Sequence, residues 1–167
     1  GKKVHGAGAK TIIKIALAPG VHAFTVGNPA NNVLSYGCQV TDLTISPASG
    51  YTGSIGLLIY SSVGGRFSNI EIQPEALAMG ITGFKLDGGA SGFFNVFDNC
   101  LGNHCHVGFH LTTTGASYPT NQTFIGCSSF GDIPYGDTTS VGFLFDVVST
   151  NSCGIDSIIV GGNVEQC

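Results

Sequence analysis

The stretch "TGFKLDGG" at residues 82–89 decides the fold, because its pattern returns at three other places in the chain. The related stretches are "IGLLIY" from Ile55, "VGFHLT" from Val107 and "VGFLFD" from Val141. In each of them a glycine precedes a large apolar residue, a variable residue and a second apolar residue. A pattern that returns along the chain in this way indicates an internal repeat. The first apolar residues recur at intervals of 27, 25 and 34 residues, at Leu57, Phe84, Phe109 and Phe143.

A second element repeats beside the first, in "VTDLTIS", "FSNIEIQ", "FNVFDNC", "QTFIGCS" and "IDSIIVG". Ile15 precedes the first core residue of this series by 28 residues, which indicates one earlier copy. Both series lengthen at the last step, so a single insertion explains both, and we predict that it is a loop at 131–139. The predicted core residues of the second element lie 27, 27, 27 and 34 residues apart, at Leu43, Ile70, Phe97, Phe124 and Ile158.

Both elements are predicted to be β-strands, because they alternate apolar and polar residues, are rich in Gly, Asn and Ser, and lack a helical period. Repeated short strands of this kind bury their apolar sides by stacking coil upon coil. The sequence therefore predicts an all-β fold, a single-stranded parallel β-helix (solenoid) of about five coils of roughly 27 residues, as a single domain over 1–167. An immunoglobulin-like sandwich is the alternative, since it also has short strands at regular spacing, but it requires no sustained period.

The composition excludes several classes of protein. Glycine supplies 26 of 167 residues and only 10% are charged, so Ser, Thr, Asn and Gly must form the solvent face. The formal net charge is −4 and no basic face is available, so we expect no nucleic acid as a partner. The longest apolar stretch contains Lys14 and is far shorter than the ~20 residues that span a membrane. Because the chain begins with Gly1 and ends within a predicted coil, we expect a processed chain or a fragment of a longer one.

In a stack of coils the side chains sort into columns, one residue per coil. Two inward columns are predicted, Leu57, Phe84, Phe109 and Phe143, and Ile59, Leu86, Leu111 and Phe145. The glycines of the repeat (56, 83, 108 and 142) are expected at a corner, where positive φ or close packing requires them. Outward columns of polar side chains offer hydrogen bonds at a regular interval, with an aromatic ring for sugar stacking, which suits a repetitive saccharide. The candidate glycan-binding residues are Tyr60, Lys85, Asp87, His110, Thr112 and Asp146, with Asn69 beside them.

Glu71 and Asp98 are 27 residues apart and form the candidate catalytic pair. Carboxylates one coil apart lie near the ~5 Å separation of retaining glycosidases, and their repulsion raises one pKa, as a general acid requires. The alternative is two solvated carboxylates on a wet β-face. Asp87 and Asp146 form a second acidic pair that could act in the same way.

Four apolar residues fall on predicted outward positions, Leu58, Leu144, Ile125 and Ile159. Such exposed apolar patches mark contacts with another chain. The alternative is a monomer in which the 131–139 loop folds back over them.

The cluster "NHCHVGFH" at 103–110 suggests zinc, but His110 belongs to an outward column and points away from the turn that holds His104, Cys105 and His106. We predict no metal site and no cofactor. Cys100 and Cys127 share one repeat position, which suits either a disulfide or a ladder of buried thiols, and we favour the thiols.

The opening "VHGAGAKTII", the "GFxL" strands and the "FxNC" and "FIGC" endings resemble the pectate-lyase-like, right-handed parallel β-helix superfamily, in particular its bacteriophage tailspike and tail-fibre branch. The resemblance covers most of the chain. It implies a right-handed β-helix, a virion or extracellular location and a parallel homotrimer. The aspartate-rich, Gly-His-Gly and Arg-x-Lys motifs of polygalacturonase-like relatives do not occur on the coils, and no catalytic set carries over.

These observations lead to three hypotheses from different classes. The first is a virion-associated module that binds host cell-surface polysaccharide. The second is a polysaccharide-degrading hydrolase or lyase that uses an acidic pair. The third is a structural spacer in a trimeric stalk or a decoration protein. Binding to bacterial surface polysaccharides, with or without shortening of the chains, distinguishes the three.

Overall fold

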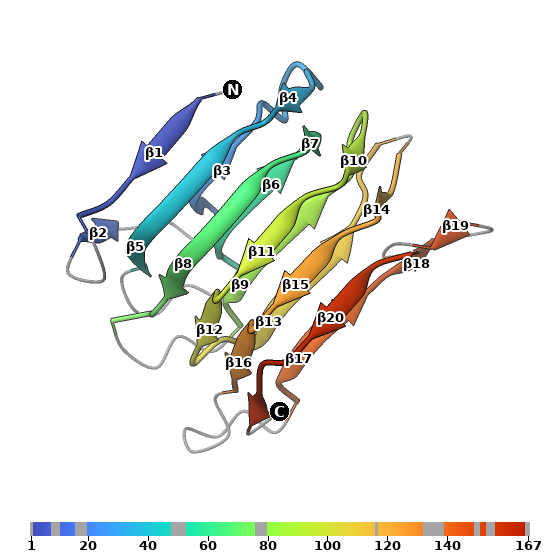
Figure 1. Ribbon diagram of the computed structural model, residues 1–167. Helices are drawn as coiled ribbons and strands as arrows, with labels where there is room; N and C mark the ends of the chain where they lie inside the picture. The colour runs from blue at the N-terminus through green and yellow to red at the C-terminus, as the bar shows by residue number, and fades with distance from the viewer. Residues whose placement is uncertain are drawn as a thin grey trace.

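The computed structural model describes residues 2–7, 11–15, 20–47, 53–75, 80–115, 117–131, 139–148, 151–152 and 156–165. Within these residues the protein is all-β and contains no helix, so no described segment could cross a membrane as a helix. Three parallel sheets, here named A, B and C, contain nearly all the strands (Figure 1). The prediction of an all-β chain is confirmed, and the parallel pairing excludes an immunoglobulin-like sandwich, which is antiparallel.

The strands of each sheet come from distant parts of the chain. Sheet A holds β1 (Lys3–His5), β2 (Ile12–Ile15), β5 (Gln39–Pro47), β8 (Arg66–Ile72), β11 (Val96–Asp98), β12 (Leu101–Asn103), β15 (Thr123–Ile125), β16 (Ser128–Phe130), β20 (Ile158–Val160) and β21 (Val164–Glu165). Sheet B holds β3 (His22–Val26), β6 (Ile55–Tyr60), β9 (Thr82–Asp87), β13 (Val107–Thr112) and β17 (Val141–Phe145). Sheet C holds β4 (Ser35–Tyr36), β7 (Ser62–Val63), β10 (Gly92–Phe93) and β14 (Pro119–Thr120). A short antiparallel pair, β18 (Val147–Val148) and β19 (Asn151–Ser152), stands apart from them.

The chain visits the three sheets in turn. From β5 in sheet A it passes to β6 in sheet B and β7 in sheet C, and it returns to sheet A at β8. Each strand then pairs in parallel with its counterpart from the previous circuit, as β8 does with β5 and β9 with β6. In Figure 1 the long strands of sheet A lie side by side in front, and those of sheet B run behind them.

The predicted register of sheet B is confirmed. Phe84 lies opposite Leu57 on one side and Phe109 on the other, and Phe109 lies opposite Phe143. The second inward column is also in register, since Leu86 pairs with Ile59 and Leu111, and Leu111 pairs with Phe145.

The predicted register of sheet A is correct at two steps and wrong at three. Leu43 lies opposite Ile70, and Phe97 opposite Phe124, as predicted. The other three steps differ: Phe97 lies opposite Phe67 instead of Ile70, Phe124 opposite Ile159 instead of Ile158, and Ile15 opposite Pro47 instead of Leu43.

A longer circuit explains the shift at Phe97. The offset between paired residues is 27 from β6 to β9 but 30 from Val63 to Phe93, so the segment between β9 and β10 contains three extra residues. Phe67 and Ile70 are both buried apolar residues, and an interval of 27 therefore selected the wrong one.

The core is built from two columns of aromatic rings that face each other. Phe67, Phe97 and Phe124 of sheet A stack with centroids 4.9 Å apart, and Phe84, Phe109 and Phe143 of sheet B stack at 4.7 Å. The columns meet edge to face, as at Phe109 and Phe124, whose centroids lie 5.5 Å apart. Both geometries are favoured by aromatic pairs, so the rings lock neighbouring circuits together.

The repeat glycines lie within the strands of sheet B, and close packing is the reason for them. A Cβ at Gly56 would lie 2.3 Å from Cγ2 of Ile72, and one at Gly108 would lie 2.2 Å from Oγ of Ser129. Ile72 and Ser129 belong to sheet A, so these glycines allow the two sheets to approach each other. Of the two reasons that the sequence suggested for them, close packing applies and positive φ does not.

The predicted loop at 131–139 lies mostly outside the described residues. The paired offset rises from 27 between β12 and β16 to 34 between β13 and β17. The segment between β16 and β17 is therefore longer by seven residues than its counterpart one circuit earlier.

Candidate functional site

The outer face of sheet B brings three of the predicted site residues together. Lys85 on β9 lies opposite His110 on β13, and His110 lies opposite Leu144 on β17. Asp146 follows β17 directly, and its backbone N–H donates to the carbonyl oxygen of Leu111 at 3.0 Å, which continues the parallel register. Alternation along the strands turns these side chains away from the aromatic core.

His110 and Asp146 form a close pair. Nε2 of His110 lies 2.9 Å from Oδ2 of Asp146, and the two side chains are 18% and 33% exposed. Burial tends to raise the pKa of Asp146, but hydrogen bonds from Thr112 and His110, together with the positive charges of His110 and Lys85, outweigh it, so the pKa of Asp146 lies below its ordinary value. The carboxylate is therefore held ionised against a ring nitrogen that can carry a proton.

Lys85 adds a positive charge to the same face. Burial, and secondly the charge of Lys85, lower the pKa of His22, which lies on β3. The charge of Lys85 also contributes to lowering the pKa of Asp146. A cation, a carboxylate and an imidazole thus share one half-buried surface, where they can bind hydroxyl and carbonyl groups of a ligand or transfer a proton.

The other predicted residues of this face are occupied within the protein. Tyr60, Asp87 and Thr112 are only 6%, 5% and 7% exposed. Asp87 accepts hydrogen bonds from the backbone N–H groups of Gly89 and Thr114 at 3.1 and 2.9 Å, and from the Thr114 hydroxyl at 2.8 Å. The Tyr60 hydroxyl donates to Oδ1 of Asn32 at 2.9 Å. These side chains hold the turns next to sheet B, and the accessible polar groups of the face are those of Lys85, His110 and Asp146.

The structure does not place Glu71 and Asp98 opposite each other. Glu71 pairs with Leu101, and Asp98 pairs with Ser68, because of the three extra residues in this circuit. Oε1 of Glu71 instead accepts a hydrogen bond from Nδ2 of Asn103 at 3.0 Å. The predicted juxtaposition of two carboxylates on neighbouring strands is therefore wrong.

Asn69 belongs to a ladder of side chains at a corner of sheet A. Asp42, Asn69 and Asn99 have positive φ values of 59°, 52° and 52°. Nδ2 of Asn69 donates to Oδ1 of Asp42 at 2.8 Å, and Nδ2 of Asn99 donates to Oδ1 of Asn69 at 3.0 Å. Asn and Asp tolerate this left-handed conformation better than other side chains do. The ladder explains Asn69 as a corner residue, and the hydrogen bonds connect three circuits.

The predicted outward apolar residues differ in exposure. Ile125 is 43% exposed on sheet A, as expected for an outward residue, and Leu144 is half-buried. Leu58 is 3% exposed and packs in a small cluster with Ile55 and Tyr60, so it does not form a surface patch as predicted. Ile159 is 46% exposed, but it lies in the column of the buried Phe124, on a strand at the edge of sheet A.

Cys100 and Cys127 are buried thiols in the same column of neighbouring circuits. The Cys100 thiol donates to the carbonyl oxygen of Phe67 at 3.4 Å, and burial raises its pKa well above the ordinary value. Cys105 is also buried in the core, whereas His110 lies on the outer face. Among the described residues no group of three or more His, Cys, Asp or Glu side chains is arranged to hold a metal ion.

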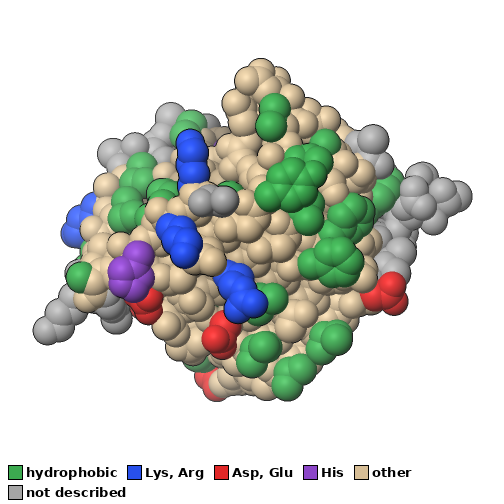
Figure 2. Space-filling model, turned by 45° about the horizontal axis from the view of Figure 1, so that its top comes forward, with side chains coloured by type: hydrophobic (Ala, Val, Ile, Leu, Met, Phe, Trp, Pro, Cys, Tyr) green, Lys and Arg blue, Asp and Glu red, His purple; other side chains and the backbone are tan. Residues whose placement is uncertain are grey.

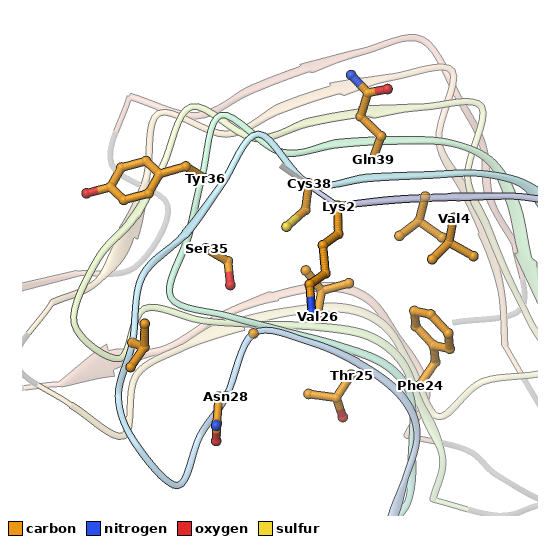
Figure 3. Close-up of a pocket in the computed structure, with 13 residues that line it drawn as sticks. Lys2, Val4, Phe24, Thr25, Val26, Asn28, Ser35, Tyr36, Cys38 and Gln39 are labelled. Carbon is orange, nitrogen blue, oxygen red and sulfur yellow. The ribbon is translucent and has the colours of Figure 1, made fainter.

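A cavity of about 440 Å³ lies between β3 and β4 on one side and β1 and β5 on the other (Figure 3). Its lining is mainly apolar, with Val4, Phe24, Val26 and Val40, and Lys2 extends into it. It has no acidic or histidine side chain in its lining, and therefore no acid and base for catalysis.

Sequence reasoning missed one exposed aromatic group. Tyr36 and Phe94 are 60% and 62% exposed, and Phe93 lies beside Phe94. The signal was available in "GFFN" at 92–95, where two adjacent phenylalanines cannot both face the core of a strand. It was missed because the strands of sheet C contain two residues each, too few for a visible alternation.

Comparison with known proteins finds no matching family model, no matching curated protein and no matching solved structure. The site must therefore be interpreted from its own geometry.

Proposed function

We propose that the chain is a module of a virion-associated tailspike or fibre, built as a right-handed single-stranded parallel β-helix, and that it binds host cell-surface polysaccharide. Two observations support the solenoid: the chain visits three parallel sheets in turn, and each circuit pairs with the one before it. The sequence patterns that resemble the tailspike branch of the pectate-lyase-like superfamily support the right-handed form and the virion or extracellular location.

The alignment of Lys85, His110 and Asp146 across three neighbouring strands carries the proposal. Neighbouring strands lie about 4.8 Å apart, so polar groups recur at a regular interval along the stack. A polymer of similar sugar units offers hydroxyl groups at regular intervals as well, and a rigid sheet binds it without ordering a loop. With 10% charged residues in the whole chain, three ionisable side chains gathered on one half-buried face form a distinctive surface.

Binding to purified capsular polysaccharides and lipopolysaccharide O-chains tests this function. We expect the protein to bind at least one of them and Lys85→Gln or Asp146→Asn to weaken that binding about tenfold, because each variant removes a charged hydrogen-bonding group. Lys14→Gln is the matched control, since Lys14 makes its ion pair with Glu75 at 2.7 Å on sheet A. Failure to bind any polysaccharide of a broad panel would overturn the proposal.

A hydrolase or lyase is the second candidate function, and the His110 and Asp146 pair favours it. An ionised carboxylate 2.9 Å from an imidazole can orient a general acid or base. The same panel tests this candidate, because an enzyme shortens the polysaccharide, which size-exclusion chromatography detects. A glycan of unchanged length after prolonged incubation would favour the binding module.

The exposed Ile125 and the half-buried Leu144 are the remaining candidates for contacts in a parallel homotrimer. We propose this assembly for the same module, with Ile159 at its periphery. A solution mass of three chains supports the trimer, and Ile125→Asp is expected to lower that mass. A protein that neither binds nor shortens any glycan, but forms a trimer, would instead be a structural stalk or decoration protein.

A further inference from the structure

A second surface of the protein lies where each circuit turns from sheet C into sheet A. Tyr36, Val63 and Phe93 lie opposite one another on β4, β7 and β10. Three residues further along each circuit, Gln39, Arg66 and Val96 lie opposite one another on β5, β8 and β11. Figure 3 shows that Tyr36 and Gln39 point away from the interior, whereas Cys38 between them points into it. We name these six residues, together with Phe94 at the turn, the corner ridge.

Phe94 is the most unusual residue of the corner ridge. It has a φ of +56°, which a bulky L side chain rarely adopts, and it is 62% exposed. Other circuits place Gly37, Gly64 and Asn121 at the same corner, with φ values of +56°, +65° and +53°. The fold therefore needs only a glycine or asparagine here, and neither burial nor backbone geometry accounts for a phenylalanine. Backbone strain of this kind concentrates at ligand-binding sites.

The aromatic rings of the corner ridge form a platform. The ring centroids of Phe93 and Phe94 lie 6.2 Å apart at an interplanar angle of 50°. Tyr36, which is 60% exposed, lies two strands from Phe93, or roughly 9–10 Å along the stack. This interval suits two sugar units of an extended glycan, one on each aromatic position.

The charge of the corner ridge is opposite to that of the whole protein. Arg66 is exposed and is the only ionisable group of the ridge apart from the Tyr36 phenol, whereas the chain has a net charge of −4. Among the described residues Arg66 makes no ion pair. Lys3 lies opposite Gln39 and extends the same outward column. Figure 2 shows Lys and Arg side chains next to a group of hydrophobic side chains on one face of the molecule.

We propose that the corner ridge binds an anionic polysaccharide. The faces of two sugar rings pack on Phe94 with Phe93 and on Tyr36, and Arg66 binds a carboxylate of the glycan through its forked N–H groups. This inference rests on the proposed polysaccharide binding, and it adds the charge of the ligand and a place on the protein that is separate from Lys85, His110 and Asp146.

Binding of alginate and hyaluronan, two polyuronates, and of neutral dextran tests the proposal. We expect the polyuronates to bind more tightly than dextran, and their binding to weaken as the salt concentration rises. Phe94→Gly is expected to weaken polyuronate binding roughly tenfold while the unfolding midpoint stays the same or rises, because glycine adopts the positive φ without strain. Arg66→Gln is expected to weaken polyuronate binding and leave any dextran binding unchanged. Ile125→Ser and Lys14→Gln serve as controls for apolar and charged positions outside the ridge.

The outcomes separate this inference from the proposed function. Polysaccharide binding that responds to Lys85→Gln but not to Phe94→Gly or Arg66→Gln would retain the function and overturn the ridge as its site. Preference for dextran would overturn the anionic ligand. A fall in the solution mass of the Phe94→Gly variant, with polyuronate binding intact, would identify the ridge as a contact between copies of the chain and overturn the inference.

Discussion

Phe97 lies opposite Phe67, thirty residues earlier in the chain, and their rings stack with centroids 4.9 Å apart. Both side chains are fully buried, and Phe97 also stacks on Phe124 and meets Phe84 and Phe109 edge to face. This one ring therefore connects three circuits of sheet A with two of sheet B. The stability of the stack depends on such residues.

Replacing Phe97 by alanine is expected to lower the free energy of unfolding by about 3–5 kcal/mol, because a large cavity would remain between the two ring columns. Urea denaturation followed by circular dichroism measures the change. Ile125→Ala, on the outer face of sheet A, is the control and should change the free energy by less than about 1 kcal/mol. A Phe97→Ala protein as stable as the wild type would contradict the observed packing.

The corner ladder predicts a difference between two substitutions of Asn69. Asn69→Ala removes the side-chain hydrogen bonds to Asp42 and from Asn99 and places a Cβ-bearing residue at φ +52°, so we expect a loss of about 1–2 kcal/mol. Asn69→Gly removes the same bonds but adopts this φ freely, and it should cost less. Thermal unfolding of both variants provides the comparison, and equal losses would show that positive φ is not part of the cost.

Asp146 predicts a pH dependence of stability. Its pKa is lowered in the folded protein from an ordinary value of 3.8, so the unfolded chain binds the proton more tightly. The stability contributed by the ionised carboxylate is therefore fully present above about pH 4 to 5 and is lost as the pH falls through the lower folded pKa. Asp146→Asn should reduce the loss of stability in acid. Unfolding midpoints between pH 7 and pH 2.5 measure it, and parallel curves for the two proteins would contradict the prediction.

The lowered pKa of Asp42 acts in the same direction, through the hydrogen bonds from Asn69 and Thr41 and the nearby His5. Some acid sensitivity is therefore expected to remain in Asp146→Asn. The double variant Asp42→Asn/Asp146→Asn should lose more of it than either single variant.

The buried thiols predict a simple pattern of alkylation. Cys100, Cys105 and Cys127 are 0%, 0% and 1% exposed, so iodoacetamide should not modify them in the native protein. The raised pKa of Cys100 further reduces the fraction of reactive thiolate. After denaturation without reductant all three should be modified, as peptide mass spectrometry can detect. Modification of Cys100 and Cys127 only after reduction would instead indicate a disulfide between them.

Much of the fold could be predicted from the spacing of large apolar residues. The inward columns of sheet B follow from "GFxL" repeats because the intervals there match the true circuits. In sheet A the same reasoning chose Ile70 as the partner of Phe97, since spacing cannot distinguish it from Phe67 when both are buried. The candidate acidic pair of Glu71 and Asp98 depended on that choice, and the true register separates it.

The sequence by itself determined the all-β class, the parallel repeat and the outward positions of Lys85 and His110, because alternation and spacing along one strand are local properties of the chain. Only the tertiary structure decided which polar side chains remain available. Asp87 and Tyr60 are buried by turns from other circuits, whereas Phe94 is exposed at a corner. The reason is that accessibility depends on how many residues each turn contains, and turn lengths vary from circuit to circuit without changing the strand pattern.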